Sequence, residues 1–155
     1  MKTGKALALT ISLLGSGVAY AANPPYSQPA GDAGQLSHIT GSLGETASKK
    51  PSAVYVWGID RKEVDRAEKN WQKPVAVTPG IHKVTVALKG VYQEFDVDFC
   101  AGCTFKVHAS YSEESSMMFK YLTSELWITR VSDGQEITDR RAGKPTPVKV
   151  SFQSF

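Results

Sequence analysis

The sequence predicts an all-β protein, a single antiparallel β-sandwich of about seven or eight strands, with a candidate short surface helix near residues 60–72. From residue 36 onward, short segments rich in β-branched and aromatic residues are separated by Gly and Pro, a pattern typical of strands and turns. The clearest segments alternate apolar and polar residues with the period of two that a strand requires. The sequence contains no internal repeat, heptad pattern or low-complexity tract, so the solenoid and coiled-coil classes are excluded.

Residues 1–21 have the three parts of a secretory signal peptide. Two lysines form a basic head, residues 6–18 are apolar, and an Ala-Tyr-Ala motif precedes the cleavage site, which we expect between Ala21 and Ala22. The protein is therefore expected to be periplasmic or secreted. An uncleaved membrane anchor is the alternative, but the apolar run has about thirteen residues where about twenty are needed to span a bilayer. No second apolar run follows, so the mature chain is expected to have no transmembrane span.

Charge and length restrict the mature chain further. The formal charge of +3 includes the two lysines of the signal peptide, which leaves +1 for the 134 residues from 22 to 155. A nearly neutral chain does not indicate a nucleic-acid partner. This length suits one domain with one core. Residues 22–35 are rich in Pro, Gly, Ser and Gln, and we expect them to form a disordered leader before a β-sandwich domain over residues 36–155.

The central hairpin carries the strongest strand signal. His82, Val84, Val86 and Leu88 share one face of its first strand, and Phe95, Val97 and Phe99 share one face of the second. Lys89-Gly90 supplies the turn between them, so one face is expected in the core and the other in water. In chain order, strands are expected at residues 36–42, 53–59, 73–77, 81–89, 92–99, 104–111, 126–132 and 148–153.

The segment 60–72 departs from the strand rhythm. Asp60 with Glu63 three residues later matches a capping box, and Val64, Ala67 and Trp71 recur at helical spacing. These residues predict a short surface helix packed by Trp71. A charged loop between two strands is the alternative.

Cys100 and Cys103 form the most specific motif of the chain, since two cysteines separated by two residues can be a disulfide, a redox couple or half a metal site. A redox couple needs a thiolate stabilised by a helix N-terminus or a cation, whereas residues 104–108 alternate as a strand. A metal site needs three or four ligands, and His108 is the only other strong donor nearby. We therefore predict a structural disulfide, with metal handling or thiol redox as the alternative.

Other candidate chemistry is weaker. No Ser, Cys or carboxylate is placed by the sequence to complete a triad with His82, so a structural role is expected for it. Six aromatic residues of the predicted strands and their surroundings are candidates for a binding face: Tyr55, Trp57, Tyr92, Tyr111, Tyr121 and Trp127. Aromatic residues in strands favour a β core, and a sugar- or peptide-binding face is the alternative. No catalytic residue, metal ligand or cofactor is predicted, and the protein is not expected to be an enzyme.

Residues 75–86, with the sequence VAVTPGIHKVTV, carry a family resemblance. A strand, a Pro-Gly turn and a second strand of this form resemble small extracytoplasmic bacterial β-sandwich domains of the PEGA-like and transthyretin-like kind, and the resemblance covers about residues 36–131. It implies a fold and a role in binding or scaffolding in the cell envelope, although this chain lacks a lipid-accepting Cys. The predicted function is a non-catalytic accessory or binding module, whose partner is an envelope protein or a cell-wall ligand.

Overall fold

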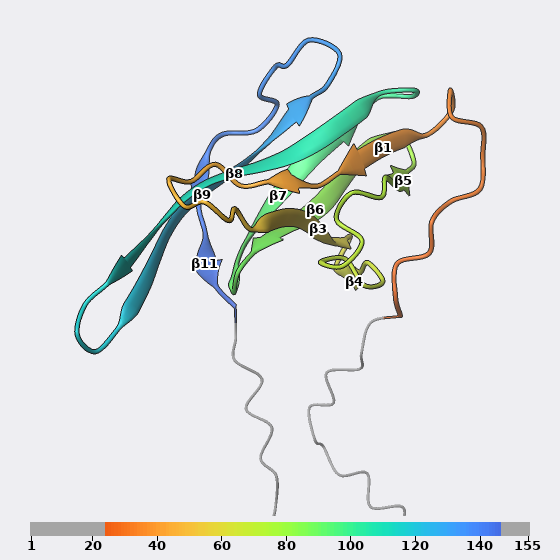
Figure 1. Cartoon of the computed structure of the whole chain (residues 1–155). Coiled ribbons are helices and arrows are strands. Elements are labelled where there is room, and N and C mark those ends of the chain that lie inside the picture. The colour runs from red at the N-terminus through yellow and green to blue at the C-terminus, as the bar shows by residue number, and fades with distance from the viewer. Residues whose placement is uncertain (1–23, 147–155) are drawn as a thin grey trace, which may run out of the picture.

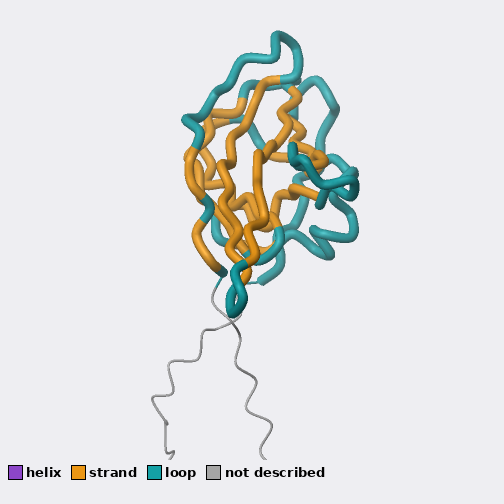
Figure 2. The backbone as a smooth tube through the Cα atoms, turned by 60° about the vertical axis from the view of Figure 1, so that its left-hand side comes forward, coloured by secondary structure: helices purple, strands orange, loops and turns teal. Residues whose placement is uncertain are grey.

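The computed structural model describes residues 24–146 and shows two β-sheets packed face to face, with no helix in that range (Figure 1). Strands fill the body of the molecule and the longer loops lie outside them (Figure 2). The strands are β1 (Ser37–Thr40), β2 (Ser42–Leu43), β3 (Ala53–Ile59), β4 (Lys62–Glu63), β5 (Val75–Val77), β6 (Gly80–Leu88), β7 (Val91–Phe99), β8 (Thr104–Ser115), β9 (Lys120–Arg130), β10 (Arg141–Ala142) and β11 (Lys144–Pro145). The predicted all-β sandwich is confirmed.

The two sheets have the strand orders β10-β9-β8-β1-β5 and β11-β7-β6-β3-β2, and β4 pairs with β3 beside the second sheet. Neighbouring strands are antiparallel except β1 and β8, which are parallel. Seven strands have three or more residues, and the other four have two. The predicted strand at residues 148–153 lies outside the described residues.

The core forms where the alternating pattern predicted it. Val84, Val86 and Leu88 of β6 are fully buried, and Val84 lies opposite Phe95 of β7. Phe99 makes an edge-to-face contact with Phe105 of the other sheet, with ring centroids 5.0 Å apart, which joins the two sheets in the interior. The outward face of β6 is less exposed than predicted, because Thr85 and Ala87 are also buried.

Strand β3 changes phase in its middle. Val54 and Val56 are buried, and the next buried large residue is Ile59 rather than the residue at position 58. The pairing with β6 shifts between Val56 and Gly58, which is a β-bulge. The extra residue, Trp57, is half-buried, and the bulge returns Ile59 to the core opposite Val84.

The helix predicted over residues 60–72 is wrong, because the segment forms turns and the two-residue strand β4. Asp60 and Arg61 both have positive φ, as in the tight turn of a hairpin, and Gly58 pairs with Glu63 across it. The Asp60 carboxylate does not cap a helix; it accepts a hydrogen bond from the backbone N–H of Lys83 at 2.9 Å. Tertiary hydrogen bonding across the strands therefore overrides the local helix signal.

Residues 24–35 contain no strand, yet they contact the sandwich. The Tyr26 hydroxyl donates a hydrogen bond to the Ala76 carbonyl at 2.7 Å, and the Gln28 side-chain oxygen accepts one from the Ala76 N–H at 3.0 Å. Both backbone groups of Ala76 that face away from β1 are satisfied in this way. These contacts cover the outer edge of β5.

Candidate functional site

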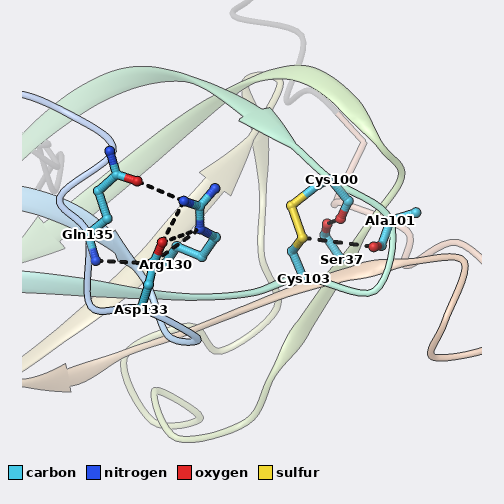
Figure 3. Close-up of a disulfide and its surroundings, with 7 residues drawn as sticks. All are labelled: Ser37, Cys100, Ala101, Cys103, Arg130, Asp133 and Gln135. Carbon is cyan, nitrogen blue, oxygen red and sulfur yellow. Dashed lines mark hydrogen bonds and ion pairs between the residues drawn. A yellow bond between two sulfur atoms is a disulfide. The ribbon is translucent and has the colours of Figure 1, made fainter.

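Cys100 and Cys103 form a disulfide that closes the turn between β7 and β8, with their Cα atoms 5.4 Å apart (Figure 3). The Ser37 hydroxyl donates a hydrogen bond to the Cys100 carbonyl, and the His38 N–H donates one to the Cys103 carbonyl at 3.0 Å. The turn is thereby fastened to β1. Strand β8 begins directly after Cys103, so no helix N-terminus is present there to stabilise a thiolate.

His108, the third donor that a metal site would use, faces a different environment. Its Nε2 is 2.8 Å from the Thr129 hydroxyl, and it lies five residues beyond Cys103 along the chain. Burial lowers the pKa of His108, with the nearby charge of Lys106 adding to the effect. Among residues 24–146, no three His, Cys, Asp or Glu side chains gather as metal ligands would.

His82 has two partners that the sequence did not reveal. Its Nδ1 is 2.6 Å from the Asp60 carboxylate, and its Nε2 is 3.0 Å from the Thr78 hydroxyl. Partial burial would raise the pKa of Asp60, but the hydrogen bonds from His82 and from the Lys83 N–H lower it below its usual value. The pairing of β3 with β6 brings these groups together from 22 residues apart.

A hydroxyl, an imidazole and a carboxylate in this order resemble the groups that activate a nucleophile. The two larger grooves of the described structure do not include any of the three residues. The His82 ring also packs edge to face on the core residue Phe99, with centroids 5.9 Å apart. The arrangement ties the β3–β4 turn to the start of β6, which fits the structural role expected for His82.

Trp127 is the most deeply buried of the six aromatic residues considered for a binding face. It neighbours the inward residues Leu126 and Ile128 on β9, so it points to the outer face, yet only 3% of it is exposed. The Arg140 guanidinium lies 3.9 Å from its ring centroid, and His108 stacks beside it with the ring planes 12° apart. An ion pair between Arg140 and Glu136 at 2.6 Å holds this cover in place. Trp127 is therefore closed to a ligand.

Tyr55 and Trp57 line a groove on the outer face of the second sheet. Its volume is about 490 Å³, and its wall comes from residues 63–69. Tyr92 of β7 makes an edge-to-face contact with Trp57, with ring centroids 6.0 Å apart. Of the other predicted aromatic residues, Tyr111 is buried in the core and Tyr121 is exposed. Three of the six aromatic residues are thus partly exposed together on one face.

The hairpin of β8 and β9 carries a second unusual surface. It projects beyond the sandwich at the lower left of Figure 1, and strand pairing continues to Ser115 and Lys120. Met117, Met118 and Phe119 at its end are 107%, 82% and 61% exposed, and Tyr121 follows at 56%. These four, here called the hairpin tip, are among only seven exposed large apolar residues in the described part of the chain.

The hairpin tip was not predicted. The two strands were expected to end at residue 111 and to begin again at residue 126, because the exposed residues between them lack the buried alternation that marks a strand. The pair Met117-Met118 was the visible signal.

Comparison of the chain with protein-family models, curated proteins and solved structures found no match in any of the three. The resemblance to PEGA-like and transthyretin-like domains stays a prediction. No helix of residues 24–146 has the length and apolar character to cross a membrane.

Proposed function

We propose that this protein is an exported, non-catalytic binding module of the bacterial envelope that docks onto a partner protein through the hairpin tip. The exposure of Met117, Met118 and Phe119 is the observation that carries the proposal. Contiguous apolar side chains held in water weaken solubility and add nothing to the core, so they indicate a surface that a partner covers. Met and aromatic residues are also enriched in the central part of protein interfaces.

The framework of the hairpin supports a docking role. Ser116 donates its N–H to the Phe119 carbonyl at 2.9 Å, which closes the turn, and continuous pairing from β8 to β9 supports the ribbon behind it. At its base, Lys89 pairs with Glu113. A preformed turn loses little conformational entropy when it binds, which favours affinity.

The charges beside the tip favour a protein over a lipid surface. Glu113 and Glu114 stand on β8 behind the apolar residues, and their charges are balanced by Lys120 of the ribbon and by Lys89, which pairs with Glu113. Anionic headgroups attract clusters of cations in excess, whereas a protein interface accommodates a mixed polar rim around an apolar centre. We therefore assign the tip to an apolar pocket on another protein.

Site-specific photocrosslinking in cells tests this function. A photoreactive amino acid replaces Met118 in the full chain, and the matched control carries it at Ile81, which is also apolar and 74% exposed but belongs to β6. We expect one discrete adduct from position 118, its loss when Phe119→Ser is added, and no such adduct from position 81. Identical adduct patterns from both positions, or no adduct from position 118, would contradict docking through the tip.

Export is tested separately. N-terminal sequencing of the protein from a periplasmic or culture-medium fraction is expected to begin at Ala22. Full-length protein confined to the cytoplasm would contradict the proposal.

A further inference from the structure

The groove over Tyr55 and Trp57 forms where the bulge of β3 meets the β3–β4 turn and the loop after it. Ala87 of β6 lies opposite Tyr55 of β3 and opposite Tyr92 of β7, so a small residue stands between two aromatic side chains. At the bulge, Trp57 is the extra residue of β3, and its side chain and that of Tyr55 both line the groove as its aromatic floor.

The wall of the groove is polar and adjustable. The Trp57 indole N–H donates to the Glu63 carboxylate at 3.4 Å, which orients the ring. Burial raises the pKa of Tyr55, and the negative charges of Glu68 and Glu63 raise it further, so the hydroxyl stays a proton donor. Within residues 24–146, the side chains of Arg66, Glu68 and Lys69 form no hydrogen bond or ion pair, so they are available to a ligand.

The charges of the groove define the ligand. Two carboxylates, Glu63 and Glu68, are balanced by Arg66 and Lys69, which gives a formal charge of zero. Such a site offers both donors and acceptors but no net attraction for an ion. A ligand that fits has an apolar face for the aromatic floor and a rim of neutral groups that both donate and accept hydrogen bonds. A pyranose ring has these properties.

A bound peptide strand fits less well. β3 pairs with β6 on one side. On the other side β2 pairs with residues 53–54 and β4 with residues 58–59, and the Val64 N–H donates to the Trp57 carbonyl at 2.9 Å, so only a short stretch of its edge is left for a peptide. Recognition there depends on side chains and aromatic faces. We propose that this groove binds a neutral oligosaccharide, with Trp57 and Tyr55 as the stacking platform and residues 63–69 as the hydrogen-bonding rim.

Isothermal titration calorimetry of the exported chain tests the site with two neutral β-1,4-linked tetrasaccharides, one of glucose and one of N-acetylglucosamine. We expect at least one to bind, Trp57→Ala to weaken its binding at least about tenfold, and Trp57→Phe to retain most of it. Tyr121→Ala, an exposed aromatic residue of the hairpin tip, is the matched control and should leave the affinity unchanged. Because the ligand is neutral, raising salt from about 50 to about 500 mM should change the affinity less than twofold.

Three results would overturn the proposal. One is the absence of saturable heat for both tetrasaccharides up to about 10 mM. The second is unchanged affinity in Trp57→Ala, and the third is an equal loss in Tyr121→Ala. Circular dichroism of each variant shows whether it is folded, and Trp57→Phe supplies the comparison if Trp57→Ala does not fold. Sugar binding and crosslinking from the hairpin tip use different residues, so either proposal can fail while the other stands.

Discussion

Replacing Met117, Met118 and Phe119 together with serine is expected to change the free energy of unfolding very little. Met117 is fully exposed, and Met118 and Phe119 hide only about a fifth and two fifths of their surfaces. Full burial of a side chain of this size contributes about 1.5–3 kcal/mol, so the three together contribute at most about 1–2 kcal/mol. That figure is an upper bound, because the unfolded chain also hides some apolar surface.

The comparison variant is Phe105→Ala, since Phe105 is 1% exposed and contacts Phe99 in the core. Phe105→Ala should lower the free energy of unfolding by about 3–5 kcal/mol. Urea unfolding followed by circular dichroism measures both variants, and equal slopes with denaturant show that the transitions are comparable. If the triple-serine variant loses as much stability as Phe105→Ala, the hairpin tip packs into the fold, and its exposure no longer supports a docking role.

Three further predictions concern the contacts that hold the sandwich. Replacing both Cys100 and Cys103 with alanine should lower the free energy of unfolding by only about 2 kcal/mol, because a loop this short restricts the unfolded chain only slightly. Thiol counting on the exported protein should find no free thiol. A readily reduced disulfide or bound zinc would instead favour the redox or metal alternative. Since the pKa of His108 is lowered in the folded state, stability should fall as pH drops below 6.5, where the unfolded imidazole takes up its proton first. His108→Gln should remove that part of the pH dependence, and an unchanged unfolding profile between pH 7 and 5 would contradict it. Tyr26→Phe removes the hydrogen bond to the Ala76 carbonyl and should lower the free energy of unfolding by about 0.5–1.5 kcal/mol. Urea unfolding measures this loss, and unchanged stability would show that the Tyr26 hydroxyl does not stabilise this edge.

Local periodicity was sufficient to predict the β6–β7 hairpin and the Cys100–Cys103 turn. In both places the residues that decide the structure are close in sequence, so alternation and turn residues carry the information. The predicted face of β6 was right for Val84, Val86 and Leu88, and the turn at Gly90 has the positive φ that glycine permits.

The errors arose where a distant strand decides the conformation. Asp60 and Glu63 resemble a capping box, but the Asp60 carboxylate is bound by Lys83 and His82, and the Glu63 carboxylate accepts a hydrogen bond from the Trp57 indole N–H. The same carboxylates suit a helix start and a hairpin turn, and only the pairing of β3 with β6 distinguishes the two. The parallel pairing of β1 with β8 is likewise invisible to local patterns.

The candidate sites were hidden for the same reason. Tyr55 and Trp57 lie in a typical strand, and the groove that they line depends on a one-residue bulge and on the distant wall of residues 63–69. The partners of His82 come from two other segments of the chain. Residue types alone therefore could not separate a core aromatic such as Tyr111 from one that lines a groove.

The edges of the sandwich give a physical reason to treat the hairpin tip as functional. Ala76 on the edge strand β5 has its outward backbone groups bound by Gln28 and Tyr26, which blocks pairing with another chain. The projecting part of β8 carries Glu113 and Glu114, and charged residues on an exposed ribbon oppose edge-to-edge aggregation. The chain thus protects both of these edges, while the hairpin tip keeps apolar side chains in water. These apolar side chains add almost nothing to the stability of the fold, and their grouping at one turn supports the proposal that a partner protein covers them.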